Sequence, residues 1–115
     1  MNAMSLESTC TVIALGASYS SLDLDALDDI GSLLLTRAVT AVPPRLVLDM
    51  SQTSFIGSTF LDLLVRTWNR LAERHGTMVL CGVQPGCAEV LRAARLDSAW
   101  PCYAAREEAV QSLSC

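Results

Sequence analysis

Short apolar runs alternate along the chain with longer stretches whose apolar residues recur at helical spacing. Nearly continuous apolar runs predict four strands, at residues 10–15, 45–50, 77–83 and 99–103. Apolar residues three and four apart predict four helices, at residues 22–40, 59–75, 84–96 and 104–113. Strands that alternate with helices through short links indicate an α/β domain with parallel strand pairs.

The helix at residues 59–75 has the clearest two-sided pattern, and Gly76 marks its end. Its predicted buried stripe consists of Leu61, Leu64, Val65, Trp68, Leu71 and Ala72. Trp68 is therefore expected to pack in the core. The helix at residues 22–40 opens with Asp23, Asp25, Asp28 and Asp29. These carboxylates suit the positive end of the helix dipole, and a divalent cation site is the alternative.

Composition narrows the classes of function. The chain has 115 residues, of which 51% are hydrophobic and 17% charged, with a net charge of −4. One globular domain is expected, and the absence of a basic stripe argues against nucleic acid and anionic membranes as partners. No apolar run reaches membrane-spanning length, and the first residues lack a secretory pattern. We therefore expect a cytoplasmic protein.

Residues with catalytic or metal-binding chemistry are sparse. Five cysteines, an odd number without a Cys-x-x-Cys pair, favour buried free thiols over disulfides or a metal site. The one histidine, His75, falls at a polar helix end, so a Ser-His-Asp triad has no base near Ser58. No glycine-rich dinucleotide or Walker motif occurs. The sequence thus favours a protein without catalytic activity, metal or cofactor.

From about residue 10 onward the chain resembles the STAS domain, the fold of the bacterial anti-sigma factor antagonists, and the matching segments lie from residue 45 on. The resemblance rests on a strand ending in Leu-Asp-Met, on "TSFIGSTFLDLL", and on the amphipathic helix that ends at Gly76. The later "MVLCGV", "LRAARLDSAWP" and "REEAV" complete the pattern. It implies a single STAS-type α/β domain over residues 10–115. The implied sheet is mixed, has four or five strands, and carries its helices mainly on one face. Residues 1–9 are expected to be an N-terminal segment, either an expression remnant or an extra edge strand.

The resemblance also implies a function for the hydroxyl pair in "TSFIGSTFLDLL". The family motif is phenylalanine, a hydrophobic residue and then Asp-Ser-Ser/Thr-Gly-Leu, and a partner serine kinase, which is also the anti-sigma factor, phosphorylates the first hydroxyl. Carried over, Ser58 is the phosphoacceptor candidate, with Thr59 as the second hydroxyl. Gly57 stands where the family has aspartate, and Phe60 where it has glycine. The implied partner-binding residues are Asp23, Gly57, Phe60, Leu61 and Asp62.

Three interpretations follow. The first is a regulatory module that docks on a serine kinase or anti-sigma factor through residues 20–25 and 57–66, with Ser58 as its switch. The second is a STAS scaffold without a phosphate switch, in which Ser58 only caps its helix and Phe60 is an exposed apolar anchor. The third, by fold analogy alone, is a binder of nucleotide or lipid, or an enzyme. A homo-oligomer is compatible with the sequence.

Overall fold

The computed structural model describes residues 4–6, 10–20 and 22–114 of the chain. Within these ranges the elements are β1 (Met4–Leu6), β2 (Thr11–Ala14), β3 (Ser18–Tyr19), α1 (Leu24–Thr40), β4 (Arg45–Asp49), β5 (Phe55–Ile56), α2 (Ser58–Glu73), β6 (Thr77–Cys81), α3 (Pro85–Ala93), β7 (Cys102–Tyr103) and α4 (Arg106–Ser114). The predicted strands and helices all occur, with ends shifted by a few residues. None of these helices is long and apolar enough to cross a membrane.

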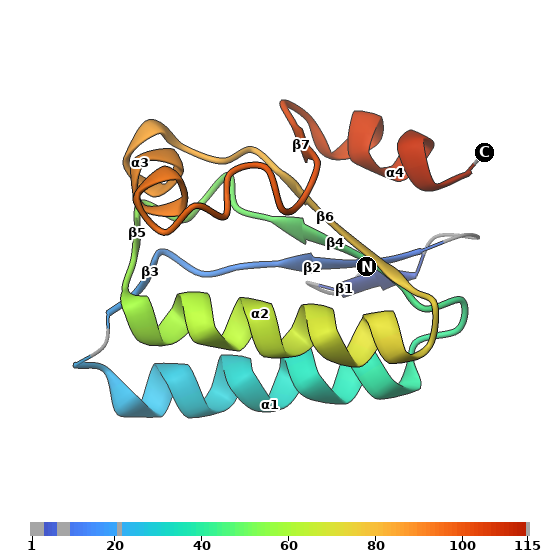
Figure 1. Ribbon diagram of the computed structural model, residues 1–115, viewed down its shortest axis with the longest axis horizontal. Coiled ribbons are helices and arrows are strands. Elements are labelled where there is room, and N and C mark those ends of the chain that lie inside the picture. The colour runs from blue at the N-terminus through green and yellow to red at the C-terminus, as the bar shows by residue number, and fades with distance from the viewer. Residues whose placement is uncertain (1–3, 7–9, 21, 115) are drawn as a thin grey trace.

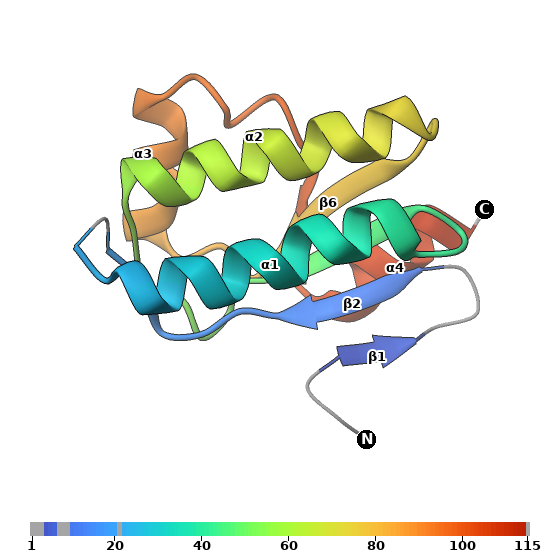
Figure 2. The ribbon, with the colours of Figure 1, turned by 90° about the horizontal axis from the view of Figure 1, so that it is seen from below.

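Five strands form one sheet in the order β1-β2-β4-β6-β7 (Figures 1 and 2). The edge strand β1 runs antiparallel to β2, and the other neighbours are parallel. Val12, Val47 and Val79 lie side by side across the three central strands, and all are buried. Central parallel strands are covered on both faces, which explains their nearly unbroken apolar sequences. The predicted mixed α/β sheet is confirmed.

The helices cover the two faces of the sheet unequally. In Figure 1, α1 and α2 lie side by side below the sheet and α4 lies above it. Buried side chains of α1, α2 and α3 share the larger core, whereas α4 packs through Ala109 on the smaller valine face. The expectation that helices pack mainly on one face is confirmed. Gly31 lets α1 approach α2 closely, since a Cβ there would lie 3.2 Å from a methyl group of Leu63.

The buried stripe of α2 differs from the predicted one. Its buried residues are Phe60, Leu61, Leu63, Leu64, Thr67 and Leu71. Trp68 is 36% exposed and meets the buried ring of Trp100 edge to face, with ring centroids 5.8 Å apart. The expectation that Trp68 lies in the core is therefore wrong. The stripe is rotated because α2 packs against α1 as well as against the sheet, so its buried side includes Leu63 and Thr67.

The cysteine prediction is partly wrong. Cys10, Cys81 and Cys87 are buried, but Cys102 is exposed on the edge strand β7. Cys115 lies outside the described residues. Burial raises the pKa of the Cys81 thiol to about 11, and the carboxylate of Asp49 acts in the same direction. This thiol is therefore protonated at neutral pH.

Two charged residues of β4 fasten α4 to the sheet. Arg106, the first residue of α4, donates from Nε and Nη2 to Oδ2 of Asp49, at 3.1 and 2.7 Å. At the other end, Nη1 of Arg45 donates to the carbonyl of Leu113 at 2.7 Å. Burial acts to raise the pKa of Asp49, but hydrogen bonds from Ser51 and Arg106 outweigh it and hold that pKa below the ordinary 3.8. The ionised carboxylate is thus the form that the fold prefers.

The turn between α2 and β6 is closed by two hydrogen bonds, from His75 N to Ala72 O and from Gly76 N to Leu71 O. His75, with φ at 58°, takes the left-handed conformation that ends the helix. Glycine is required at position 76 for a different reason, since a Cβ there would lie 2.3 Å from the Pro44 carbonyl oxygen.

We expect Asp49→Asn to lower the free energy of unfolding by about 1 kcal/mol at pH 7, because a partly screened charge-assisted contact is lost. A depressed folded pKa stabilises the fold above the unfolded pKa, and this contribution disappears as the pH falls through the folded value. The difference between variant and wild type should therefore shrink below about pH 4. Urea unfolding between pH 2 and 7 measures this difference in stability. A difference that does not change with pH would contradict the lowered pKa of Asp49. Glu89→Gln, which breaks an exposed ion pair with Arg92, is the control with little effect.

Gly76→Ala should lower the free energy of unfolding by about 2 kcal/mol or more, because the methyl group overlaps the backbone at Pro44. Gly86→Ala is the matched control. A Cβ there meets only the Ser54 carbonyl oxygen, at 3.5 Å, and α3 should gain about 0.5–1 kcal/mol from alanine. Thermal and urea unfolding of the two variants should move in opposite directions. Equal shifts would mean that the turn accommodates a side chain.

Candidate functional site

The loops that leave β2 and β4 are joined at the carboxyl edge of the sheet by a second, two-stranded sheet. Strands β3 and β5 pair in parallel, with Ser18 opposite Phe55 and Tyr19 opposite Ile56. Neither segment is among the strands that the apolar pattern predicts, because two residues are too few to show a strand pattern. The pair ends directly before α2, so it fixes where that helix begins.

Hydrogen bonds tie the same two loops together beside the strand pair. Thr53 Oγ1 donates to the Gly16 carbonyl at 2.7 Å, and the side chain of Thr53 is fully buried. The backbone N–H groups of Ser54 and Gly57 donate to the carbonyls of Ala17 and Tyr19, both at 2.8 Å. Sequence reasoning missed Thr53, whose hydroxyl gives no signal until its partner across the fold is known.

Ser58 is the first residue of α2, and its side chain is exposed. The helix cap is the preceding residue, Gly57, in an extended conformation with φ at −101° and ψ at 176°. The expectation that Ser58 is the N-cap is therefore wrong. The positive end of the α2 dipole lies beside the Ser58 hydroxyl, because Ser58 is the first residue of the helix. Glycine at the cap offers no side-chain oxygen, and the first turn has no acidic residue to offset that positive end. Thr59 is also exposed and follows directly.

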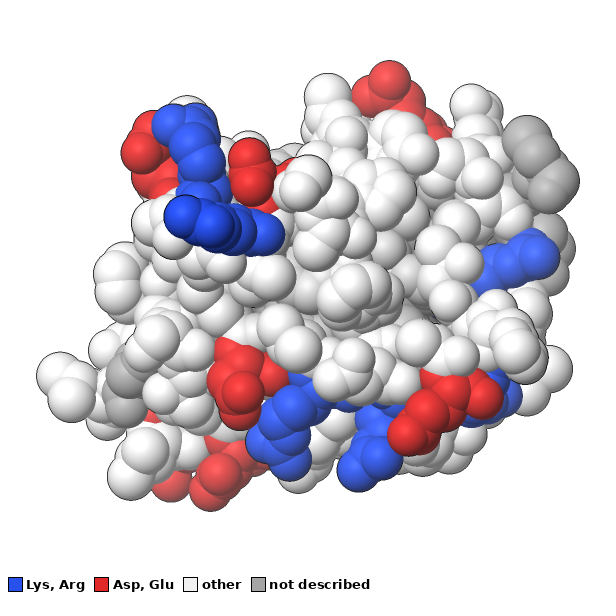
Figure 3. Space-filling view, viewed as in Figure 1, with Lys and Arg blue, Asp and Glu red and all other residues white. Residues whose placement is uncertain are grey.

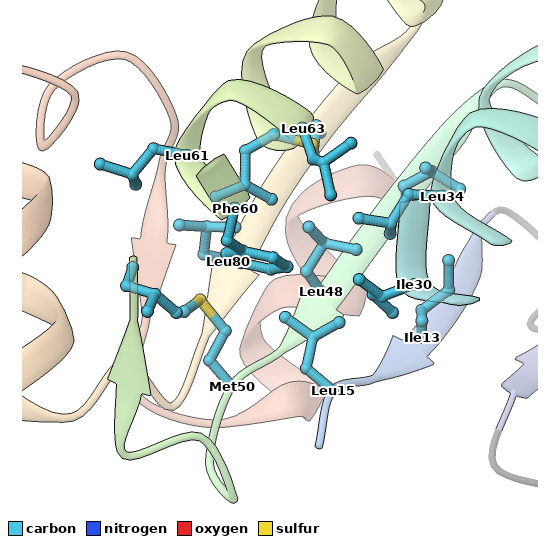
Figure 4. Packing of buried hydrophobic residues seen from close by; sticks show 14 of the residues in the cluster. Ile13, Leu15, Ile30, Leu34, Leu48, Met50, Phe60, Leu61, Leu63 and Leu80 are labelled. Carbon is cyan, nitrogen blue, oxygen red and sulfur yellow. The ribbon is translucent and has the colours of Figure 1, made fainter. Parts of the chain in front are cut away.

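Phe60 points away from the surface (Figure 4). Its ring is fully buried and stacks on Tyr19, with centroids 4.6 Å apart and planes 11° from parallel. Leu61 is only 8% exposed. The expectation that Phe60 is an exposed anchor for a partner is wrong. The helix turns this side chain inward, where Tyr19 of the neighbouring loop supplies the contact.

The remaining predicted partner residues lie at the same end of the molecule as Ser58. Asp23 caps α1, and its Oδ1 accepts the Ala26 N–H at 3.1 Å. In Figure 1, α1 and α2 begin side by side, so the loop with Asp23 lies near the start of α2. Asp62 is exposed one turn into α2, whereas His75 is at its far end. Among the residues described, no three histidines, cysteines or carboxylates are grouped so as to hold a metal ion.

Phe60→Ala should lower the free energy of unfolding by about 3–5 kcal/mol, since it removes a fully buried ring and its stacking contact with Tyr19. Phe55→Ala is the matched control, because that ring is 50% exposed and its loss should cost under about 1 kcal/mol. Urea unfolding followed by circular dichroism measures both. A Phe60→Ala variant as stable as Phe55→Ala would contradict the inward packing.

Comparison with known proteins agrees with this architecture. The STAS domain family model matches residues 2–109. The structure of an anti-sigma-factor antagonist (STAS) domain protein from Planctomyces limnophilus is 32% identical, with a TM-score of 0.87 and coverage of 97% of each chain. The unphosphorylated anti-sigma factor antagonist SpoIIAA shares 21% identity, with a TM-score of 0.80 over 95% of this chain and 92% of its own. Phosphorylated SpoIIAA from Bacillus shares 19% identity, with a TM-score of 0.72 over 95% and 96%.

A search of curated proteins gave no match. The family model spans nearly the whole chain, and the match to the Planctomyces protein covers 97% of each chain. The chain belongs to the STAS domain family.

Proposed function

We propose that this protein is a non-catalytic regulatory module of the anti-sigma factor antagonist kind, acting in the cytoplasm without a cofactor. Its partner is a serine protein kinase that also serves as the anti-sigma factor, and phosphorylation of Ser58 switches the contact. The observation that carries this proposal is the exposed hydroxyl of Ser58 at the first position of α2 in a STAS chain. The relative SpoIIAA has been solved in unphosphorylated and phosphorylated forms, which supports the same chemistry here.

The surroundings of Ser58 suit a phosphate. The N–H groups of the first turn of a helix have no acceptor within the helix, and the dipole favours negative charge there. Gly57 caps α2 without a side-chain hydrogen bond, and the first turn of the helix contains no acidic residue. The backbone around the hydroxyl is held by the β3–β5 pair and by the Gly57 N–H bond to Tyr19.

A phosphate at this position changes the local charge strongly. It adds about −1.5 to −2 charges at pH 7. Asp62, one turn further along α2, and Asp23, at the cap of α1, are exposed acidic residues at the same end of the molecule. A partner that buries Ser58 would have to dehydrate the phosphate, so modification should weaken that contact.

The second candidate function is a STAS scaffold that binds its partner without a phosphate switch. Gly57 favours it, because the aspartate of the family motif is missing directly before the acceptor. Phe60 does not support the scaffold function, since its ring is buried and cannot serve as an exposed anchor. The two candidates differ in one measurable property, the modification of Ser58.

Incubation with the serine kinase of the source organism and ATP should add one phosphate per chain, at Ser58 by tandem mass spectrometry. Ser58→Ala should abolish the modification, whereas Thr59→Ala, the neighbouring hydroxyl, should retain it. The phosphorylated protein should bind the kinase at least about tenfold more weakly, the scale of one desolvated charge in an interface. Kinase binding without phosphate on Ser58 would favour the scaffold. If the kinase neither binds the protein nor phosphorylates it, both candidate functions are overturned.

A further inference from the structure

A cavity of about 290 Å³, open to solvent, lies beside the first half of α1. Its lining consists of Tyr19 from β3 together with four residues of α1, which are Ala26, Asp29, Ile30 and Leu33. The helix residues are mostly three or four positions apart, so they form one stripe along α1. Small-molecule sites in proteins start at about 300 Å³, are mostly apolar and contain a few polar groups. This cavity has that composition and lies at the small end of that range.

The apolar wall of the cavity is part of the core. Tyr19 and Ile30 are each only 7% exposed and belong to the main hydrophobic cluster. Ala26 and Leu33 are half-buried and pack against the same cluster. The Tyr19 ring is held in place by its stacking on Phe60. A wall that is ordered before binding loses little conformational entropy when a ligand arrives.

Two polar groups of the lining have bonding capacity that the chain does not use. The Tyr19 hydroxyl accepts the Gly16 N–H at 2.6 Å, but none of the described residues accepts the proton of that hydroxyl. The exposed carboxylate of Asp29 likewise has no hydrogen bond or ion pair with any residue in the described ranges. A ligand with an oxygen acceptor and a cationic group would use both of these groups.

The charge beside the cavity is negative. Asp25 and Asp29 lie one helical turn apart and are both exposed. The segments that supply the lining, residues 16–20 and 24–33, contain no arginine or lysine. The next basic residue along α1 is Arg37, about 12 Å beyond Asp29 at the helical rise per residue. Figure 3 agrees: the lower-left corner, where α1 and α2 begin in Figure 1, shows red and white atoms, and blue atoms start further along α2.

We infer that this cavity binds a small organic cation, an amine with an apolar body and an oxygen acceptor. The ammonium group pairs with Asp29, the apolar body lies against Ile30 and Leu33, and the Tyr19 hydroxyl donates to the oxygen. Nucleotides and fatty acids are poor occupants, because their phosphate or carboxylate groups would be repelled by Asp29. The inference goes beyond the proposed function, since neither Ser58 nor a kinase takes part in it.

The test uses the protein alone and the probe 2-phenoxyethylamine, which carries an aromatic ring, an ether oxygen and an ammonium group. Titration followed by proton–nitrogen correlation NMR should show saturable shifts of the Ala26, Ile30 and Leu33 amides, with a dissociation constant of about 1 mM, typical of so small a ligand. The amide of Val39, in the last turn of α1, should not move. The matched alcohol, 2-phenoxyethanol, should bind about threefold to tenfold more weakly, because it lacks the charge that pairs with the carboxylate. The anion phenoxyacetate should cause no shift.

Variants locate the site. Asp29→Asn should weaken binding of the amine by the same factor and leave binding of the alcohol unchanged. Asp28→Asn is the matched control, because Asp28 is exposed on the same turn of α1 but does not line the cavity, and it should bind like the wild type. Ala26→Leu, which fills part of the cavity, should weaken binding of both compounds. Thermal unfolding of every variant verifies the fold.

Two sets of results would overturn the inference. Equal affinity for the amine and the alcohol, or equal binding of the amine by Asp29→Asn and Asp28→Asn, would show that Asp29 recognises no cation. Shifts that do not saturate, or that are as large at Val39 as at Ile30, would show that the cavity is not a ligand site.

Discussion

The stacking of Tyr19 on Phe60 is the contact on which the geometry around Ser58 depends. It joins the loop after β2 to the first turn of α2, two segments about forty residues apart in the chain. Parallel strands end at the same edge of a sheet, so the loops that follow them must be held together by contacts outside the main sheet. Here the ring stack, the β3–β5 pair and the Thr53 hydroxyl provide these contacts, and Ser58 is displayed on the far side of the same helical turn.

This arrangement places buried and exposed side chains within a few residues of each other. Ile56 and Phe60 point into the core, while Phe55 and Ser58 point outward. Alternation along β5 and rotation around α2 produce the separation without any special backbone conformation. A change at the outward positions leaves the packing intact, so the surface of this edge can vary while the fold stays the same. The fastening of α4 by Arg45 and Asp49 on the opposite face is independent of that edge except through the loop that begins after Asp49.

The sequence predicted the order of the main elements because each carries a long apolar pattern that local geometry dictates. It could not predict β3 and β5, since two residues show no period and their pairing is set by a segment far along the chain. The rotation of α2 that exposes Trp68 depends on α1 as a second neighbour, which the pattern of one helix does not reveal. The choice of Ser58 as the phosphoacceptor candidate came from the family resemblance. The burial of Phe60 could not follow from that resemblance, because its partner, Tyr19, lies outside the motif.

The two departures from the family motif have different physical consequences. At position 60, the ring replaces glycine on the inward side of the helix, where Tyr19 covers it, so the surface beside Ser58 is not enlarged by an apolar group. At position 57, glycine replaces an aspartate, and this removes a negative charge and a competing acceptor from the start of α2. A dianionic group on Ser58 would thus be repelled less by the residue that precedes it. If Ser58 is phosphorylated as proposed, glycine at position 57 would favour retention of the phosphate, and the proposed kinase would have to recognise side chains further from the acceptor.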